Sequence, residues 1–128
     1  MIPFLHGRLA SFKPAFAGLR YVLRSQPNAR LHGFISVIVI LTGLWVRLEL
    51  VEWGLIVLAM GLVWVTEFLN TAMEAAVDLA SPDHHRLAEI AKDVSAAAVV
   101  LAVLAAVVIG ILLLGPPLWI RANSWFGE

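Results

Sequence analysis

The hydrophobic positions divide the chain into four stretches, each long enough to form a helix. In the first, over residues 11–25, apolar side chains recur every three or four residues, and the basic residues lie elsewhere on the helical wheel. This pattern predicts an amphipathic helix on a membrane surface, with a soluble helix packed on protein as the alternative. Residues 1–10 are expected to form a loose start, and Pro27 to break the helix.

Two apolar stretches that follow predict transmembrane helices over residues 29–46 and 53–79. The second stretch stays helical in pattern from its apolar part into an acidic part without a break. A helix over 53–79 is about 40 Å long, longer than the ~30 Å hydrocarbon core, so its last turns should leave the membrane.

A third spanning helix is predicted over residues 82–114. Ser81 and Pro82 suit the N-cap and first helical position, and Gly115-Pro116-Pro117 is expected to end the helix. Its uncharged part, 94–114, is long enough to span a bilayer.

Composition supports a membrane protein. Hydrophobic residues make up 61% of the 128 positions and charged residues 14%, against about 45–50% and about 25% in soluble domains. The sequence therefore predicts a single all-α integral membrane domain over residues 1–128, with three transmembrane helices preceded by a surface helix. The chain has no cysteine, which excludes disulfides and thiolate metal sites.

The basic residues predict the orientation of the spans. Two of them lie on one side of the predicted membrane, Arg47 and Arg121, and seven on the other: Arg8, Lys13, Arg20, Arg24, Arg30, Arg86 and Lys92. Because loops rich in Lys and Arg stay inside, the N-terminus and the acidic part of the second span are expected in the cytoplasm.

The acidic part of the second span places its polar residues on one helical face. At about 100° per residue, the following side chains share that face: Glu67, Asn70, Thr71, Glu74 and Asp78. Like charges four residues apart repel each other, so metal ions, Lys or Arg should compensate them.

These residues suggest chemistry on phosphate. Lys92 and Asp93 begin the third span at the same depth, and Gln26 precedes the first. Carboxylates hold Mg²⁺, a lysine neutralises phosphate, and one carboxylate can accept the proton of a nucleophile. Other interpretations stay open. The chain could be a non-catalytic or cation-transport membrane protein that uses the acidic face, and Glu67 could form a simple ion pair with Lys92.

Two motifs identify a family. Residues 67–78 read E-F-L-N-T-A-M-E-A-A-V-D and fit the pattern E-x-x-N-(S/T)-A-(I/M)-E-x-x-V-D, and A-K-D follows at residues 91–93. Upstream, residues 28–32 read N-A-R-L-H. These motifs closely resemble those of the prokaryotic diacylglycerol kinase family, which includes the undecaprenol kinases, and the last is similar to a segment of undecaprenol-kinase-like members. The resemblance covers about residues 11–114.

The resemblance implies a homotrimer in the bacterial inner membrane, with active sites between neighbouring subunits, that uses ATP and Mg²⁺ to phosphorylate a lipid alcohol. No nucleic acid partner is expected. Carried over by position, Glu67 would be the catalytic base and Glu74 would bind metal. The residues implied around the nucleotide and substrate are Asn70, Lys92, Asp93 and Asp78.

Gln26 departs from the family pattern. The family usually has a glutamate at this position as a second metal ligand, and no acid occurs in this chain before Glu49. An amide oxygen coordinates a cation without contributing charge, so weaker metal binding is the hypothesis. The choice between diacylglycerol and undecaprenol as substrate stays open.

Overall fold

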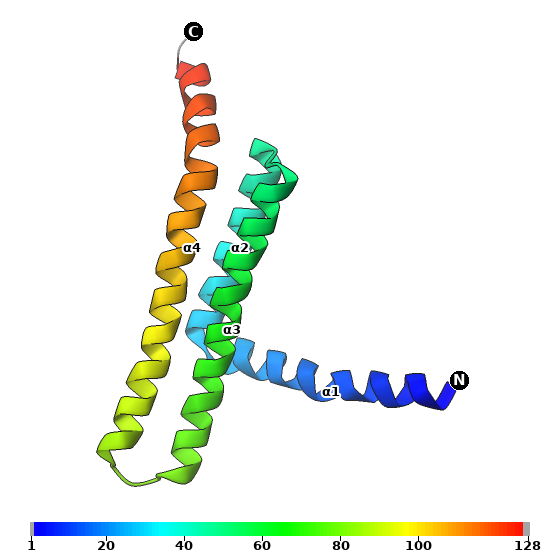
Figure 1. Cartoon of the computed structure of the whole chain (residues 1–128), viewed down its shortest axis with the longest axis vertical. Helices are drawn as coiled ribbons and strands as arrows, with labels where there is room; N and C mark the ends of the chain where they lie inside the picture. The colour runs from blue at the N-terminus through cyan, green and yellow to red at the C-terminus, as the bar shows by residue number, and fades with distance from the viewer. Residues whose placement is uncertain (1, 127–128) are drawn as a thin grey trace.

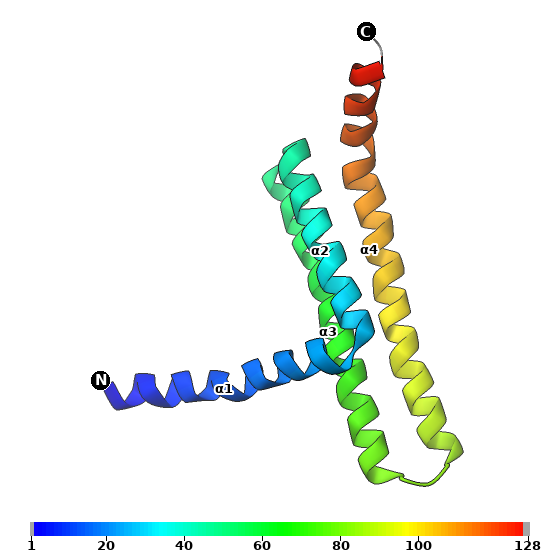
Figure 2. The ribbon, with the colours of Figure 1, turned by 180° about the vertical axis from the view of Figure 1, so that it is seen from behind.

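The computed structural model describes the backbone of residues 2–126 and the side chains of residues 12–124. Its four helices are α1 (Ile2–Ser25), α2 (Pro27–Val46), α3 (Leu50–Ala80) and α4 (Arg86–Phe126). α2, α3 and α4 lie side by side, while α1 projects steeply away from them (Figures 1 and 2). Each of α2, α3 and α4 contains a segment long and apolar enough to cross a membrane, which confirms the prediction of an all-helical protein with three spans.

The α2–α3 connection is a tight turn fixed by local interactions. Arg47 adopts the left-handed conformation (φ 63°) and closes α2 with a hydrogen bond from its N–H to the Gly43 carbonyl. Glu49 and Glu52 then form a capping box, in which each side chain accepts a hydrogen bond from the other residue's backbone N–H. Gly43 also lets Trp53 pack closely, since a Cβ there would lie 2.9 Å from the indole ring.

The α1–α2 junction turns at Gln26. Gln26 has an extended backbone, and Pro27 follows at the first position of α2, where its missing N–H does no harm. The expected break therefore occurs at the predicted place. The expectation of a loose start over residues 1–10 is wrong for residues 2–10, which are helical.

Both ends of α4 differ from the prediction of 82–114. The helix begins at Arg86, because His85 caps it: its Nδ1 accepts the N–H of Leu87 and its carbonyl accepts that of Ala88. At the other end, α4 continues through Pro116 and Pro117. Prolines are tolerated in membrane helices, where neighbouring groups and local adjustments satisfy the freed carbonyls.

α3 is the central helix of the packing, and its buried face changes chemistry along its length. Every third or fourth residue on this face is buried: Ile56, Ala59, Val63, Glu67 and Thr71. The same face that packs apolar side chains in the first half of α3 therefore carries a buried carboxylate and hydroxyl in the second half. This change positions the candidate site between α2 and α4.

Candidate active site

The acidic face of α3, which helical periodicity predicted as one face, contacts segments on both sides of α3. Glu67 faces α2, Glu74 meets Gln26 at the α1–α2 junction, and Asp78 meets α4. Glu67 and Glu74 are seven residues apart on one helix, which places them about 10 Å apart along its axis. The site therefore has an inner part around Glu67 and an outer part around Glu74.

The outer part is a chain of hydrogen bonds that we call the amide–carboxylate cluster: Gln26, Asn70, Glu74 and Ser95. Each oxygen of the Glu74 carboxylate accepts one amide N–H, from Gln26 at 3.1 Å and from Asn70 at 3.1 Å. The Ser95 hydroxyl lies 2.7 Å from Asn70 Oδ1. Because the Glu74 carboxylate can only accept, Asn70 turns its NH₂ group toward Glu74, which leaves Asn70 Oδ1 as the acceptor for Ser95.

Lys92 pairs with Asp78 across the ends of α3 and α4. The pair is largely solvent-exposed, so the lysine remains accessible. The alternative of a simple ion pair between Lys92 and Glu67 is wrong, because Asp78 takes the ammonium group. Asp93 is exposed, and among the described residues no hydrogen bond or ion pair joins it to the cluster. Adjacent residues of a helix face directions about 100° apart, which separates Asp93 from Lys92.

The inner part is a buried pair formed by His32 and Glu67. Glu67 is 2% exposed, and its Oε2 lies 3.7 Å from His32 Nε2. Neither of these two atoms has a hydrogen-bond partner among the described residues. Sequence reasoning named both residues but not their contact, because they lie on different helices.

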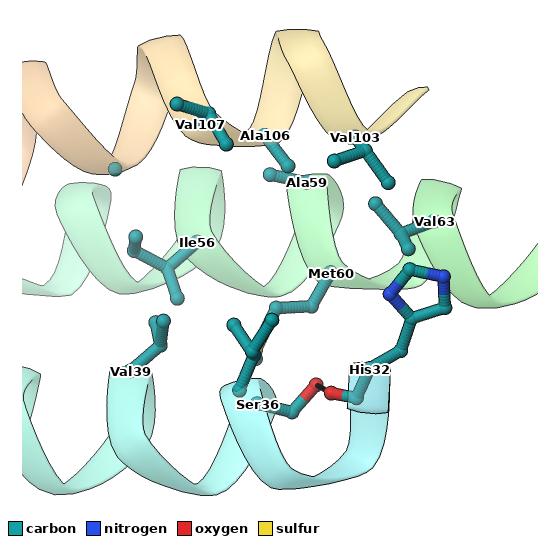
Figure 3. A pocket seen from close by; sticks show the side chains of 12 residues that line it. His32, Ser36, Val39, Ile56, Ala59, Met60, Val63, Val103, Ala106 and Val107 are labelled. Atoms are coloured by element: carbon teal, nitrogen blue, oxygen red, sulfur yellow. Dashed lines mark hydrogen bonds between the residues drawn. The ribbon is translucent and has the colours of Figure 1, made fainter. Parts of the chain in front are cut away.

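An apolar groove between α2, α3 and α4 begins at His32, and we call it the chain groove (Figure 3). Its volume is about 180 Å³. Apart from His32 and Ser36, its lining is apolar: Ile35, Val39, Ile56, Ala59, Met60, Val63, Val103, Ala106, Val107 and Gly110. Nothing in the sequence pattern indicated this groove, because its three walls come from three helices.

Trp64 also has a role that the sequence did not indicate. The Trp64 indole N–H donates to Ser36 Oγ at 3.3 Å, and its ring lies 6.1 Å from that of Phe68. The sequence feature that could have indicated this role is the position of Trp64 in the middle of an apolar run, away from the interface where tryptophan anchors lie.

The outer part fits a divalent cation held jointly with a nucleotide. Magnesium is usually bound through one or two carboxylates, with phosphate oxygens and water completing the shell. Glu74 supplies one carboxylate, and the amide oxygens of Gln26 and Asn70 become ligands if the amides turn. No group of three or more His, Cys, Asp or Glu side chains that could hold an ion occurs among the described residues, so phosphate would have to supply the remaining ligands.

Comparison with known proteins gives the family. Residues 13–114 match the family described as prokaryotic diacylglycerol kinase. The chain is 45% identical over 111 residues to a diacylglycerol kinase of Synechocystis sp., covering 86% of this chain and 63% of that relative. It is 37% identical over 108 residues to an undecaprenol kinase of Bacillus subtilis, covering 84% of this chain and 88% of the relative.

A diacylglycerol kinase of Escherichia coli is 30% identical over 100 residues, covering 78% of this chain and 82% of the relative. All three relatives are named as lipid kinases, which does not favour the alternative of a cation pathway through the membrane. The family match extends from α1 into α4 and includes the amide–carboxylate cluster, Glu67 and His32. The chain therefore belongs to the prokaryotic diacylglycerol kinase family of lipid kinases.

Proposed function

We propose that this protein transfers the γ-phosphate of ATP to the hydroxyl of a membrane lipid alcohol. The observation that carries the proposal is the buried Glu67 carboxylate, which has an oxygen without a hydrogen-bond partner among the described residues. It lies beside His32, the residue at which the chain groove begins. A buried acceptor without a donor costs about 1–3 kcal/mol, so such a group is stable only if something regularly supplies the donor. A lipid hydroxyl entering from the bilayer is such a donor.

The residues divide the work between the two parts of the site. Glu67 accepts the proton of the lipid hydroxyl as the general base. Glu74 holds the Mg²⁺, which neutralises developing charge on the phosphates. Asn70, fixed by Ser95, orients the transferred phosphate, and Lys92 contacts the nucleotide phosphates from the exposed side. Asp78 and Asp93 support this outer part.

Gln26 is proposed as a weak metal ligand. In this structure its amide donates to Glu74, so it partly neutralises that carboxylate without adding a negative charge. A cation at Glu74 has to displace this donor or turn the amide. Both effects support weaker metal binding than two carboxylates would give.

The assembly and orientation are also proposals. Many large apolar side chains of α2, α3 and α4 are exposed, for example Leu41, Leu58 and Leu101, and lipid or neighbouring subunits would cover them. We propose a homotrimer in the bacterial inner membrane, with α1 on its cytoplasmic surface and the site open to cytoplasmic ATP. The excess of Lys and Arg on that side supports this orientation.

The test is phosphate transfer by the purified protein in vesicles that contain a lipid alcohol, ATP and Mg²⁺. Glu67→Gln and Glu74→Gln should each lower the rate at least about a hundredfold, as removal of a general base or a metal ligand does. Glu52→Gln is the matched control on the same helix, because glutamine also serves in a capping box. Equal rates for all four proteins would contradict the proposal.

A further inference from the structure

The strongest unexplained feature of the site is a pair of buried polar atoms with no partner. In the amide–carboxylate cluster, both oxygens of Glu74 are occupied. In the inner part, Glu67 Oε2 and His32 Nε2 lack a hydrogen-bond partner among the described residues, although both are buried. Buried polar atoms are nearly always satisfied, so these two indicate a group that the protein binds.

We propose that His32 and Glu67 together hold the hydroxyl of the substrate, and that the chain groove selects an alcohol whose only polar group is this hydroxyl. This inference rests on the proposed kinase function and adds the substrate class. Polyprenols are alcohols of this kind, because pure hydrocarbon follows the hydroxyl. Diacylglycerol is not, since it carries two ester groups beside the hydroxyl.

The separation of the two atoms suits a bridging oxygen. At 3.7 Å they are too far apart for a direct hydrogen bond. A single oxygen about 2.8 Å from each atom would bridge them. Both atoms are closed off from solvent in this structure, so the two side chains have to move apart to admit it. A hydroxyl can donate to Glu67 Oε2 and accept from His32, provided that the neutral imidazole carries its hydrogen on Nε2.

The transfer balances with these groups. The hydroxyl O–H bond breaks and its proton passes to Glu67 Oε2, while the oxygen forms a bond to the γ-phosphorus of ATP. The bond from that phosphorus to the β,γ-bridging oxygen breaks, and ADP leaves with the electron pair. His32 keeps its proton throughout, so it is a positioning residue for the hydroxyl.

The groove offers almost nothing to a polar substrate. Its second polar side chain, Ser36, is already engaged, because it donates to the His32 carbonyl at 2.7 Å and accepts the Trp64 indole N–H at 3.3 Å. Among the side chains that the structure describes, no other polar one lines the groove. Each ester carbonyl of diacylglycerol would therefore be buried without a donor, which lowers affinity about tenfold or more per carbonyl.

The groove accommodates the beginning of a chain. Its α3 wall extends from Ile56 to Val63, which are seven positions and about 10 Å apart along the helix. The first carbons of a polyprenol would lie between α2, α3 and α4, with His32 at the polar end (Figure 3). Gly110 belongs to the α4 wall of the groove. The rest of the chain would continue into the bilayer, where it needs no protein contact.

The test compares a long-chain polyprenol with dioleoylglycerol in the same vesicles, with ATP and Mg²⁺. We expect kcat/KM at least tenfold higher for the polyprenol. His32→Phe keeps a ring and removes the donor, and it should lower kcat/KM for the polyprenol about tenfold to a hundredfold. His32→Gln restores a donor and should recover most of it, while the KM for ATP stays unchanged in both. If His32 had only a structural role, both substitutions would also change the KM for ATP, and His32→Gln would not restore kcat/KM for the polyprenol.

Gly110→Leu tests the groove. A Cβ at Gly110 meets nothing within 4 Å, so the new side chain can fill the groove without a clash. It should raise the KM for the polyprenol about tenfold, whereas Gly61→Leu, at an exposed glycine with equal space, should not. Equal use of the two lipids, or an unchanged KM in Gly110→Leu, would overturn the proposal.

A binding measurement separates this proposal from the kinase function. Radiolabelled polyprenol should bind the protein in detergent micelles without ATP, and Gly110→Leu should reduce this binding about tenfold. If the wild type phosphorylates neither lipid, the kinase proposal fails and the binding result still decides the groove. If the wild type phosphorylates diacylglycerol alone and does not bind polyprenol, the groove proposal fails and the kinase function stands.

Discussion

Replacing Gln26 by glutamate should make the stability of this protein depend on Mg²⁺. In the wild type, the Gln26 amide donates to Glu74 Oε2 at 3.1 Å. In Gln26→Glu this favourable contact becomes a pair of facing carboxylates. Two unit charges ~4 Å apart repel by about 4 kcal/mol at an effective dielectric constant of ~20. Both side chains are partly exposed, so solvent screening reduces the expected destabilisation to about 1–3 kcal/mol.

A divalent cation reverses this effect. The carboxylate introduced by Gln26→Glu and that of Glu74 would hold the cation together, so their repulsion would be relieved and a charged ligand would replace a neutral amide. A gain of about 1.4 kcal/mol or more in binding corresponds to at least a tenfold lower half-saturating Mg²⁺ concentration. The variant should therefore unfold roughly 5–10 °C earlier than the wild type in chelator, and recover when Mg²⁺ is added.

The assay is thermal unfolding in detergent across a Mg²⁺ titration, with the Mg²⁺ dependence of phosphate transfer as a second readout. Gln26→Met is the control, because it removes the hydrogen bond and adds no charge. It should lose about 0.5–1.5 kcal/mol in chelator, and Mg²⁺ should not stabilise it more than it stabilises the wild type. If Gln26→Glu matches the wild type in both its unfolding temperature and its Mg²⁺ dependence, Gln26 does not adjoin a metal site and the reasoning is refuted.

Two further variants test the outer part of the site and the α2–α3 turn. Lys92→Met breaks an exposed pair with Asp78, so the free energy of unfolding should change by under about 1 kcal/mol. The KM for ATP should rise about tenfold or more. If this KM does not change, Lys92 does not belong to the nucleotide site. Gly43→Ala places a Cβ 2.9 Å from the Trp53 ring and should destabilise the fold by about 1–3 kcal/mol. Gly54→Ala is the control, because a Cβ there meets open space. In the same unfolding assay it should be neutral or stabilising by up to about 1 kcal/mol.

Features set by a single helix could be predicted from the sequence. The shared face of Glu67, Glu74 and Asp78 depends only on helical periodicity, and the structure places all three against neighbouring segments as expected. The break at Gln26 was also predictable, because Pro27 fixes it locally.

Features that depend on contacts between helices could not be predicted. The pairing of His32 with Glu67 depends on how far α2 is shifted along α3, and no local pattern records that shift. The ends of α4 were misjudged for a different reason. Pro82 and Pro116 are ordinary helix boundaries in water, but His85 caps the helix later than expected and the helix continues through Pro116.

The lengths of the helices also relate this protein to the thickness of its membrane. α4 has 41 residues, and its uncharged run over 94–120 is about 40 Å long, which exceeds the ~30 Å of an average hydrocarbon core. α2 has only 20 residues, which corresponds to about 30 Å and matches an average hydrocarbon core with no excess. Gln26 is fixed at one end of α2 and the tight turn at Arg47 closes the other. In a thicker bilayer the lipid must thin around α2, or the amide–carboxylate cluster is drawn into hydrocarbon. The shortest span therefore determines in which membranes this site meets the water phase.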